Sequence, residues 1–191
     1  MSTVIEAVPV TMSVEEFLAL PEDGLRRELI RGEVRERGMA VRNRVHSRVM
    51  GRLAQHFNNW LDTHPHPKGI IHVGDAGFRL RGTADSLVGI DLAYASPALV
   101  AATPRKQAYY DGPPVLAIEI LSPSDTQEDI FEKVELYLEA GVVVWLVDPN
   151  LRIVTVCRPN LSSEPLGMSD ELSGEPELAG VRVIVATIFQ V

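Results

Sequence analysis

The sequence predicts a single α/β domain (α+β in its mixture of pairings) in which a mixed central sheet is flanked by helices. Residues 115–147 have the pattern of a strand, a helix and a second strand, and such a unit pairs its strands in parallel through a right-handed crossover. Hairpin patterns over residues 28–39 and 142–157 add antiparallel pairs. The chain has 191 residues, of which 46% are hydrophobic and 23% charged, so it can form one domain with its own core.

The N-terminal part of the chain is expected to hold an arm followed by a short helix. Residues 1–12 are interpreted as a flexible arm, and residues 13–191 as the domain. Ser13 and Glu16 have the spacing of a capping box, which predicts that a helix starts there. Pro21 ends that helix, because proline cannot continue it.

The next part of the chain predicts a hairpin, a long helix and two short strands. The hairpin covers residues 28–39 and turns at Gly32. Within residues 43–61 the apolar side chains recur at helical spacing, which predicts the first long helix. Residues 70–73 and 77–81 are expected to be separate short strands.

Two almost wholly apolar runs follow, and both are expected to be central strands covered on both faces. They comprise residues 87–94 and 115–121, joined by a proline-rich connection at residues 96–114. A helix follows the second run and ends near Gly141, a residue suited to the position just after a helix. Residues 142–147 are expected to be another buried strand.

The C-terminal part predicts less regular structure. Residues 153–157 are expected to pair back on the preceding strand as a hairpin. Residues 159–180 are polar and contain glycine and proline, which favours a loop. Residues 181–185 are expected to form a last edge strand.

The charge distribution argues against a protein dedicated to binding nucleic acid. The formal net charge is −8, whereas such proteins usually carry a basic balance or a basic patch. Residues 26–52 nevertheless hold nine arginines, half of the 18 basic residues. This segment is either a local phosphate-facing patch or a set of solvated hairpin and helix faces.

The remaining composition favours a cytoplasmic protein with no membrane partner. The single cysteine, Cys157, excludes a disulfide framework and is typical of a reducing compartment. The N-terminus lacks the basic start and apolar stretch of a signal peptide. No apolar run approaches the roughly 18 residues that a membrane helix needs.

Two acidic residues lie inside the apolar runs, where an ionised carboxylate is costly unless it is compensated. Asp91 lies within residues 87–94, and Glu119 lies near the end of residues 115–121. Lys133 follows on the next helix, at the edge of its apolar stripe. Four glutamates lie on the opposite face of that helix, which is expected to face solvent: Glu128, Glu132, Glu135 and Glu139.

Two carboxylates and a lysine on adjacent core elements are the parts of a metal-dependent phosphodiesterase site. Carboxylate oxygens suit Mg2+, which keeps several waters of its own, and a nearby lysine can orient the attacking water. Each residue also has a structural explanation. Asp91 could close a loop, Glu119 could form a structural ion pair, and Lys133 could extend its stem along the core with its ammonium in water.

Several segments of the chain resemble the bacterial Uma two family of restriction-type endonucleases. The most specific likeness is residues 112–149, GPPVLAIEILSPSDTQEDIFEKVELYLEAGVVVWLVDP. Supporting likenesses are residues 13–34, SVEEFLALPEDGLRRELIRGEV, residues 89–97, GIDLAYASP, and residues 178–189, LAGVRVIVATIF. The family belongs to the PD-(D/E)XK phosphodiesterase superfamily, so the resemblance implies a restriction-endonuclease-like fold.

The resemblance also implies roles for individual residues. Asp91 matches the aspartate of the PD motif, although Ile90 stands where the motif has proline. Glu119 matches the acid of the second motif, and Lys133 matches a lysine that this family carries on the helix. The superfamily's accessory glutamate on the first helix has no match here, and Glu28 and His46 are the nearest candidates.

The function that follows is Mg2+- or Mn2+-dependent phosphodiester hydrolysis by a restriction-type endonuclease acting on DNA. Asp91, Glu119 and the Ile120 carbonyl would hold the metal, and Lys133 would orient the water. One alternative is a non-catalytic or regulatory binding module that retains the fold. Another is a metal hydrolase for a small phosphorylated substrate, which would suit the acidic charge better. Because cutting two strands needs two sites, a homodimer is expected.

Overall fold

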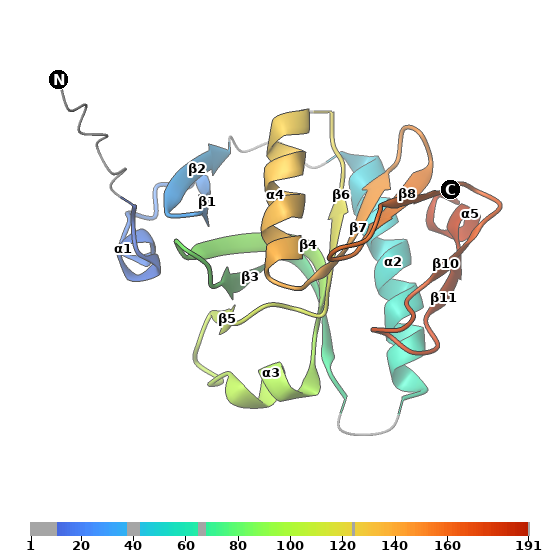
Figure 1. Cartoon of the computed structure of the whole chain (residues 1–191), viewed down its shortest axis with the longest axis horizontal. Coiled ribbons are helices and arrows are strands. Elements are labelled where there is room, and N and C mark those ends of the chain that lie inside the picture. The colour runs from blue at the N-terminus through green and yellow to red at the C-terminus, as the bar shows by residue number, and fades with distance from the viewer. Residues whose placement is uncertain (1–10, 38–42, 65–67, 124, 191) are drawn as a thin grey trace, which may run out of the picture.

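A large mixed sheet with helices on both of its faces forms the body of the protein (Figure 1). The computed structural model describes residues 11–37, 43–64, 68–123 and 125–190. The predicted arm at residues 1–12 falls mostly outside these ranges, since the description begins at residue 11. None of the helices in the described ranges is long and apolar enough to cross a membrane.

The described residues form five helices and eleven strands. The helices are α1 (Val14–Leu18), α2 (Arg44–Asp62), α3 (Pro97–Ala102), α4 (Gln127–Glu139) and α5 (Val185–Ile188). The strands of the main sheet are β1 (Arg26–Ile30), β2 (Glu33–Arg37), β3 (Ile70–Leu80), β4 (Ser86–Ala95), β5 (Tyr109–Asp111), β6 (Leu116–Ile120), β7 (Val143–Asp148), β8 (Ile153–Cys157) and β9 (Glu164–Leu166). A separate two-stranded sheet is formed by β10 (Glu171–Ser173) and β11 (Arg182–Ile184).

The sheet is mixed, as the sequence predicts. Its strands follow the order β2-β1-β4-β6-β7-β8-β9, and β3 and β5 extend it from the other edge of β4. Strands β6 and β7 are parallel and are joined through α4, which is the crossover unit expected for residues 115–147. The hairpins β1–β2 and β7–β8 are antiparallel.

The central strands are almost wholly apolar because each of their faces packs against a helix. In β6 the side chains of Leu116, Ile118 and Ile120 pack in the same core cluster as α2, whereas Ala117 packs in the cluster that contains α4. Alternation along the strand sends successive side chains to opposite faces. Figure 1 shows α4 in front of the sheet and α2 behind it.

Helix α4 is capped by hydrogen bonds at both ends. The Thr126 hydroxyl caps its start by accepting the Asp129 N–H at 3.1 Å. At its end Gly141 has a φ of +79°, and its N–H donates to the Leu138 carbonyl at 3.0 Å. The Val142 N–H donates to the Tyr137 carbonyl at 2.9 Å, which completes a Schellman motif. The predicted terminal glycine is therefore confirmed.

Two expectations about the strands are wrong. Residues 70–73 and 77–81 are not separate strands, because β3 runs from Ile70 to Leu80 with a bulge between Val73 and Ala76. Gly74 and Asp75 supply that bulge with φ values of +84° and +64°. The local composition around Gly74 predicts that the strand ends there. In the structure the pairing with β4 continues on both sides of the bulge.

The C-terminal region is also more ordered than its composition indicates. Residues 159–180 contain β9 and β10 rather than an uninterrupted loop. Strand β11 pairs with β10 instead of joining the edge of the main sheet, and α5 begins at Val185. These strands are only three residues long and are defined by their pairing, β9 with β8 and β10 with β11, so their own composition does not reveal them.

Candidate active site

The site lies at a fork where two strands share one edge of β4. Strand β1 pairs with β4 at Leu29 and Leu87, and β6 pairs with β4 only from Ile118 and Leu92 onward. Strand β3 occupies the other edge of β4. The β4 residues 88–91 therefore face a gap between β1 and β6, where the backbone needs other partners.

Charged side chains supply those partners at Gly89. The Gly89 N–H donates to Glu28 Oε1 at 3.0 Å, and the Gly89 carbonyl accepts from Lys133 Nζ at 3.3 Å. Lys133 Nζ also lies 3.1 Å from Glu28 Oε1. The lysine is only 7% exposed, so its ammonium is held inside the fork and does not extend into bulk water.

Asp91 closes the base of the fork. Its Oδ2 accepts the Ile120 N–H at 3.0 Å and lies 3.1 Å from His46 Nε2. Burial favours the neutral acid and by itself raises the pKa of Asp91. The hydrogen bonds from His46 and Ile120, with the charge of Lys133, outweigh burial and hold that pKa below its usual value. Asp91 is therefore an ionised carboxylate at neutral pH.

Glu119 faces α4. Its Oε1 lies 3.0 Å from Lys133 Nζ and accepts the Tyr137 hydroxyl at 2.6 Å. Burial raises the pKa of Glu119, and the neighbouring charge of Asp91 adds to that effect, while Lys133 and Tyr137 only partly oppose it. Burial together with the charge of Glu119 also raises the pKa of Tyr137 well above its usual value, so this hydroxyl remains a donor.

A cleft of about 1100 Å³ opens over these side chains. Among the described residues that line it, carboxylates outnumber Lys and Arg side chains by seven to three. The acidic side chains are Glu28, Glu36, Asp75, Asp91, Glu119, Asp125 and Asp129, and the basic ones are Arg26, Arg27 and Lys133, with His46 beside them. A cleft with this excess of carboxylates attracts cations. It repels a polyanion such as DNA unless bound cations compensate the negative charge.

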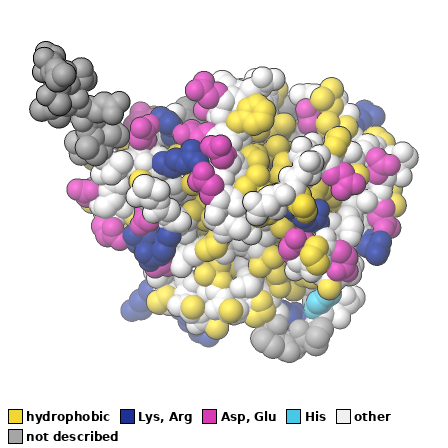
Figure 2. Space-filling view, viewed as in Figure 1, with side chains coloured by type: hydrophobic (Ala, Val, Ile, Leu, Met, Phe, Trp, Pro, Cys, Tyr) yellow, Lys and Arg dark blue, Asp and Glu magenta, His cyan; other side chains and the backbone are white. Residues whose placement is uncertain are grey.

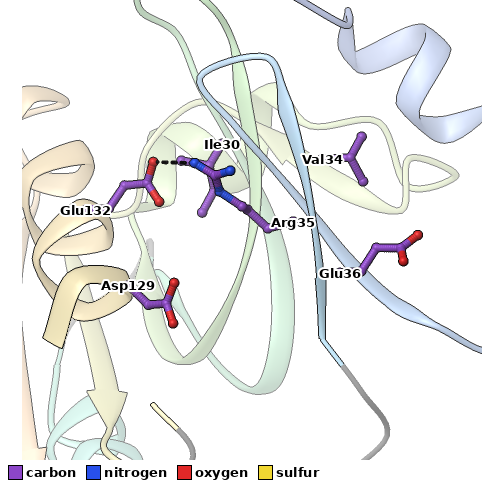
Figure 3. Close-up of a pocket in the computed structure, with 6 residues that line it drawn as sticks. All are labelled: Ile30, Val34, Arg35, Glu36, Asp129 and Glu132. Atoms are coloured by element: carbon purple, nitrogen blue, oxygen red, sulfur yellow. Dashed lines mark hydrogen bonds and ion pairs between the residues drawn. The ribbon is translucent and has the colours of Figure 1, made fainter. Parts of the chain in front are cut away.

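Where the structure describes the arginine side chains of the β1–β2 hairpin, acidic side chains pair with them, which favours solvated hairpin faces over a phosphate-facing patch. Arg26 pairs with Asp75, and Arg27 pairs with Glu36 at 2.8 Å. Figure 3 shows Arg35 of β2 reaching Glu132 of α4, with an N–O distance of 3.0 Å. In Figure 2 basic and acidic side chains lie interspersed over the visible face.

Glu128, Glu135 and Glu139 of α4 are exposed, as the sequence predicts, and the last two also pair with the β1–β2 hairpin. Arg31 lies 3.2 Å from Glu135 and 2.9 Å from Glu139, so the hairpin is tied to two turns of the helix. Glu132 is also held there, since its side chain is only 24% exposed. The helix and the hairpin together enclose the fork.

The residues of the fork suit a hard divalent cation. Ile120 directs its N–H toward Asp91, and the Leu121 N–H donates to Val147 on the other side at 2.9 Å. Because N–H and C=O of one strand residue point to the same side, the Ile120 carbonyl also faces Asp91. Across the described ranges, no three His, Cys, Asp or Glu side chains form a complete metal cage. Mg2+ needs none, since it commonly binds one or two carboxylates and keeps its waters.

Comparison with known proteins agrees with this architecture. A crystal structure described as a "putative nuclease belonging to DUF820" from Anabaena variabilis is similar, with a TM-score of 0.78 and 20% identity over 93% of this chain and 97% of that chain. No curated protein sequence matches the chain. A family model described as "Putative restriction endonuclease", Uma2, matches residues 14–187. The chain belongs to the Uma2 family.

The Uma2 fold brings the sequence-predicted site residues together. Asp91, Glu119, Ile120 and Lys133 all line one cleft, and the Lys133 ammonium is directed at Glu119, as its place on the helix predicts. Glu28, considered only as a possible accessory acid, contacts Lys133 directly. The catalytic and metal-binding roles of these residues remain predictions.

Two contacts of the Uma2 site were not foreseen from the sequence. His46 lies against Asp91, although it was considered only as a substitute for a missing acid. Tyr137 is a buried residue of α4, and its hydroxyl donates to Glu119. Its position one helical turn after Lys133 was the available signal, because residues four apart share a helix face.

Proposed function

We propose that this Uma2 protein is a Mg2+- or Mn2+-dependent endonuclease that hydrolyses phosphodiester bonds in DNA. The observation that supports the proposal is the fork itself, where Asp91, Glu119 and Lys133 line one cleft at the end of the β4–β6 pairing. Family membership supports nuclease chemistry in general. The metal, the substrate and the residue roles are proposed from the side chains present.

In the proposed reaction Asp91, Glu119 and the Ile120 carbonyl hold the metal. When bound, the ion supplies charge neutralisation on the phosphate and lowers the pKa of a coordinated water. Lys133 orients the attacking water and stabilises the extra negative charge of the transition state. The water gives up a proton to solvent and its oxygen bonds to phosphorus, the bond from phosphorus to the leaving oxygen breaks, and that oxygen takes a proton from solvent.

Cleavage assays with a Glu119→Gln variant test the proposal. The change is nearly isosteric, so the fold should persist while the anionic ligand is lost. We expect the wild-type chain to cut plasmid DNA with Mg2+ or Mn2+ and to stop when the metal is chelated. Glu119→Gln should lose more than about 100-fold in rate, beyond the upper end for changes that only support a ligand. Undiminished activity in Glu119→Gln would refute the assignment.

Two other outcomes would favour the alternatives. DNA binding without any metal-dependent cleavage would favour a regulatory module that retains the nuclease fold. Hydrolysis of a small phosphodiester such as bis-p-nitrophenyl phosphate, with DNA left intact, would favour a small-substrate hydrolase, and the carboxylate-rich cleft is the observation in its favour.

We further propose that the chain acts as a homodimer, because cutting both strands of a duplex requires two sites. Sedimentation of the full chain, with and without duplex DNA, tests this proposal. A monomer in both conditions that nevertheless linearises plasmid DNA in one step would contradict it.

A further inference from the structure

Tyr137 places a single polar atom inside an otherwise apolar contact. The residue is 0% exposed, and its ring packs in the core cluster between α4 and the sheet, beside Leu136, Ala117 and Val144. Phenylalanine would supply the same apolar surface. Burying a hydroxyl is costly unless it is hydrogen-bonded, and the partner of this hydroxyl is Glu119 Oε1, at 2.6 Å.

Glu119 Oε1 therefore receives two donors from the same helix face. Tyr137 and Lys133 lie four residues apart on α4, and the lysine ammonium lies 3.0 Å from the same oxygen. The Tyr137 hydroxyl and the Lys133 ammonium at Oε1 restrict the orientations open to the carboxyl group. The second oxygen of Glu119 is then the one available to a ligand in the cleft that this residue lines.

We propose that Tyr137 is a positioning residue, whose hydroxyl holds Glu119 in the rotamer that presents its second carboxylate oxygen to the metal. This inference rests on the proposed function, because it assumes that Glu119 is a metal ligand. Partners of this kind orient ligating carboxylates and are worth about 10–100-fold in metal affinity or activity. Glutamate has three side-chain torsions to restrict, so an unheld Glu119 pays for that ordering each time it binds.

The backbone and the ring of Tyr137 are both held in place, which suits this role. Its backbone carbonyl accepts the Val142 N–H at 2.9 Å within the Schellman motif, so the last turn of α4 cannot rotate freely. Its ring is fully buried in the core cluster that contains residues of β6, β7 and α4. A donor fixed in this way can select one rotamer of its acceptor, whereas a mobile donor would follow the acceptor.

The test is Mn2+ affinity of the full chain, measured by calorimetry or by the EPR signal of free Mn2+, beside thermal unfolding. Tyr137→Phe removes only the hydroxyl. Tyr110→Phe is the matched control, because its hydroxyl also makes a side-chain hydrogen bond, 2.8 Å from His72 Nε2, but does not line the cleft. Glu119→Gln is the reference for loss of the ligand itself.

We expect Tyr137→Phe to weaken Mn2+ binding about tenfold, Tyr110→Phe to leave it unchanged, and Glu119→Gln to abolish it. Wild-type affinity in folded Tyr137→Phe, with binding lost in Glu119→Gln, would overturn the positioning role and leave the metal site standing. Binding that survives Glu119→Gln would overturn the metal site and, with it, this inference. If Tyr137→Phe does not fold, Tyr137→Met removes the same hydroxyl and supplies an adaptable apolar side chain. Its Mn2+ affinity is then compared with those of the wild-type chain and of Glu119→Gln in the same way.

Discussion

Replacing Lys133 by methionine should destabilise the protein far more than replacing an ordinary surface lysine. The Lys133 ammonium lies 3.0 Å from Glu119 Oε1, 3.1 Å from Glu28 Oε1 and 3.3 Å from the Gly89 carbonyl, and the side chain is 9% exposed. Methionine keeps most of the aliphatic stem but leaves two buried carboxylates without this cation. Removing one partner of a buried ion pair costs about 3–5 kcal/mol.

The loss should depend on pH in a defined direction. Burial already raises the pKa of Glu119, and removing Lys133 takes away the strongest opposing influence, so this pKa rises further. An acid whose pKa is higher in the folded than in the unfolded state loses stability as pH rises from the unfolded to the folded value. The deficit of Lys133→Met should therefore be smallest near pH 4 and should grow as pH rises through the pKa of Glu119.

Urea unfolding of Lys133→Met and of the wild-type chain at several pH values measures this deficit. The dependence of the unfolding free energy on urea concentration should be the same for both, as a check on two-state behaviour. Lys106→Met is the matched control, since Lys106 is exposed and should change stability by less than about 0.5 kcal/mol. Adding Glu119→Gln to Lys133→Met should recover part of the loss, because one buried charge is removed. A deficit under about 0.5 kcal/mol, or one that grows on acidification, would refute the reasoning.

Three further predictions follow from the same geometry. Because burial raises the pKa of Glu119, Mn2+ affinity should decline as pH falls through that pKa, toward about tenfold per pH unit; a flat calorimetric profile from pH 8 to pH 5 would contradict this. Glu28→Gln should lower turnover about tenfold with Mn2+ affinity nearly unchanged, since Glu28 contacts Lys133 at 3.1 Å; an equal loss of affinity would make Glu28 a metal ligand. Gly51→Ala should stabilise the folded protein by about 1 kcal/mol, because a Cβ at this position of α2 meets nothing within 4 Å. Gly141→Ala should destabilise it by about 1 kcal/mol, because φ at Gly141 is +79°. Urea midpoints that shift in the same direction for both would be the contrary result.

The sequence by itself determined the elements whose causes are local. The capping box at Ser13 and Glu16 forms as its spacing predicts, with the Glu16 N–H donating to Ser13 Oγ at 3.2 Å. The terminal glycine of α4 and the apolar runs of β6 and β7 are likewise short-range features. Such features depend on residues within one or two turns of each other, so composition and periodicity suffice to predict them.

The candidate site was only partly accessible to the same reasoning. Asp91 and Glu119 could be singled out because a carboxylate inside an apolar run is costly and needs an explanation. Lys133 could be placed at the edge of a helix face. Their convergence on one cleft could not be predicted from periodicity, because it depends on where the pairing of β4 with β6 stops.

Only the tertiary structure decided which partners these residues have. Lys133 and Glu28 are 105 positions apart in the chain, Arg31 and Glu139 are 108 apart, and Arg35 and Glu132 are 97 apart. The bulge of β3, the pairing of β9 with β8 and the pairing of β10 with β11 likewise depend on the register with a neighbouring strand. Local patterns record which face of an element is apolar, whereas the register between elements is set by hydrogen bonds and packing that exist only once the chain has folded.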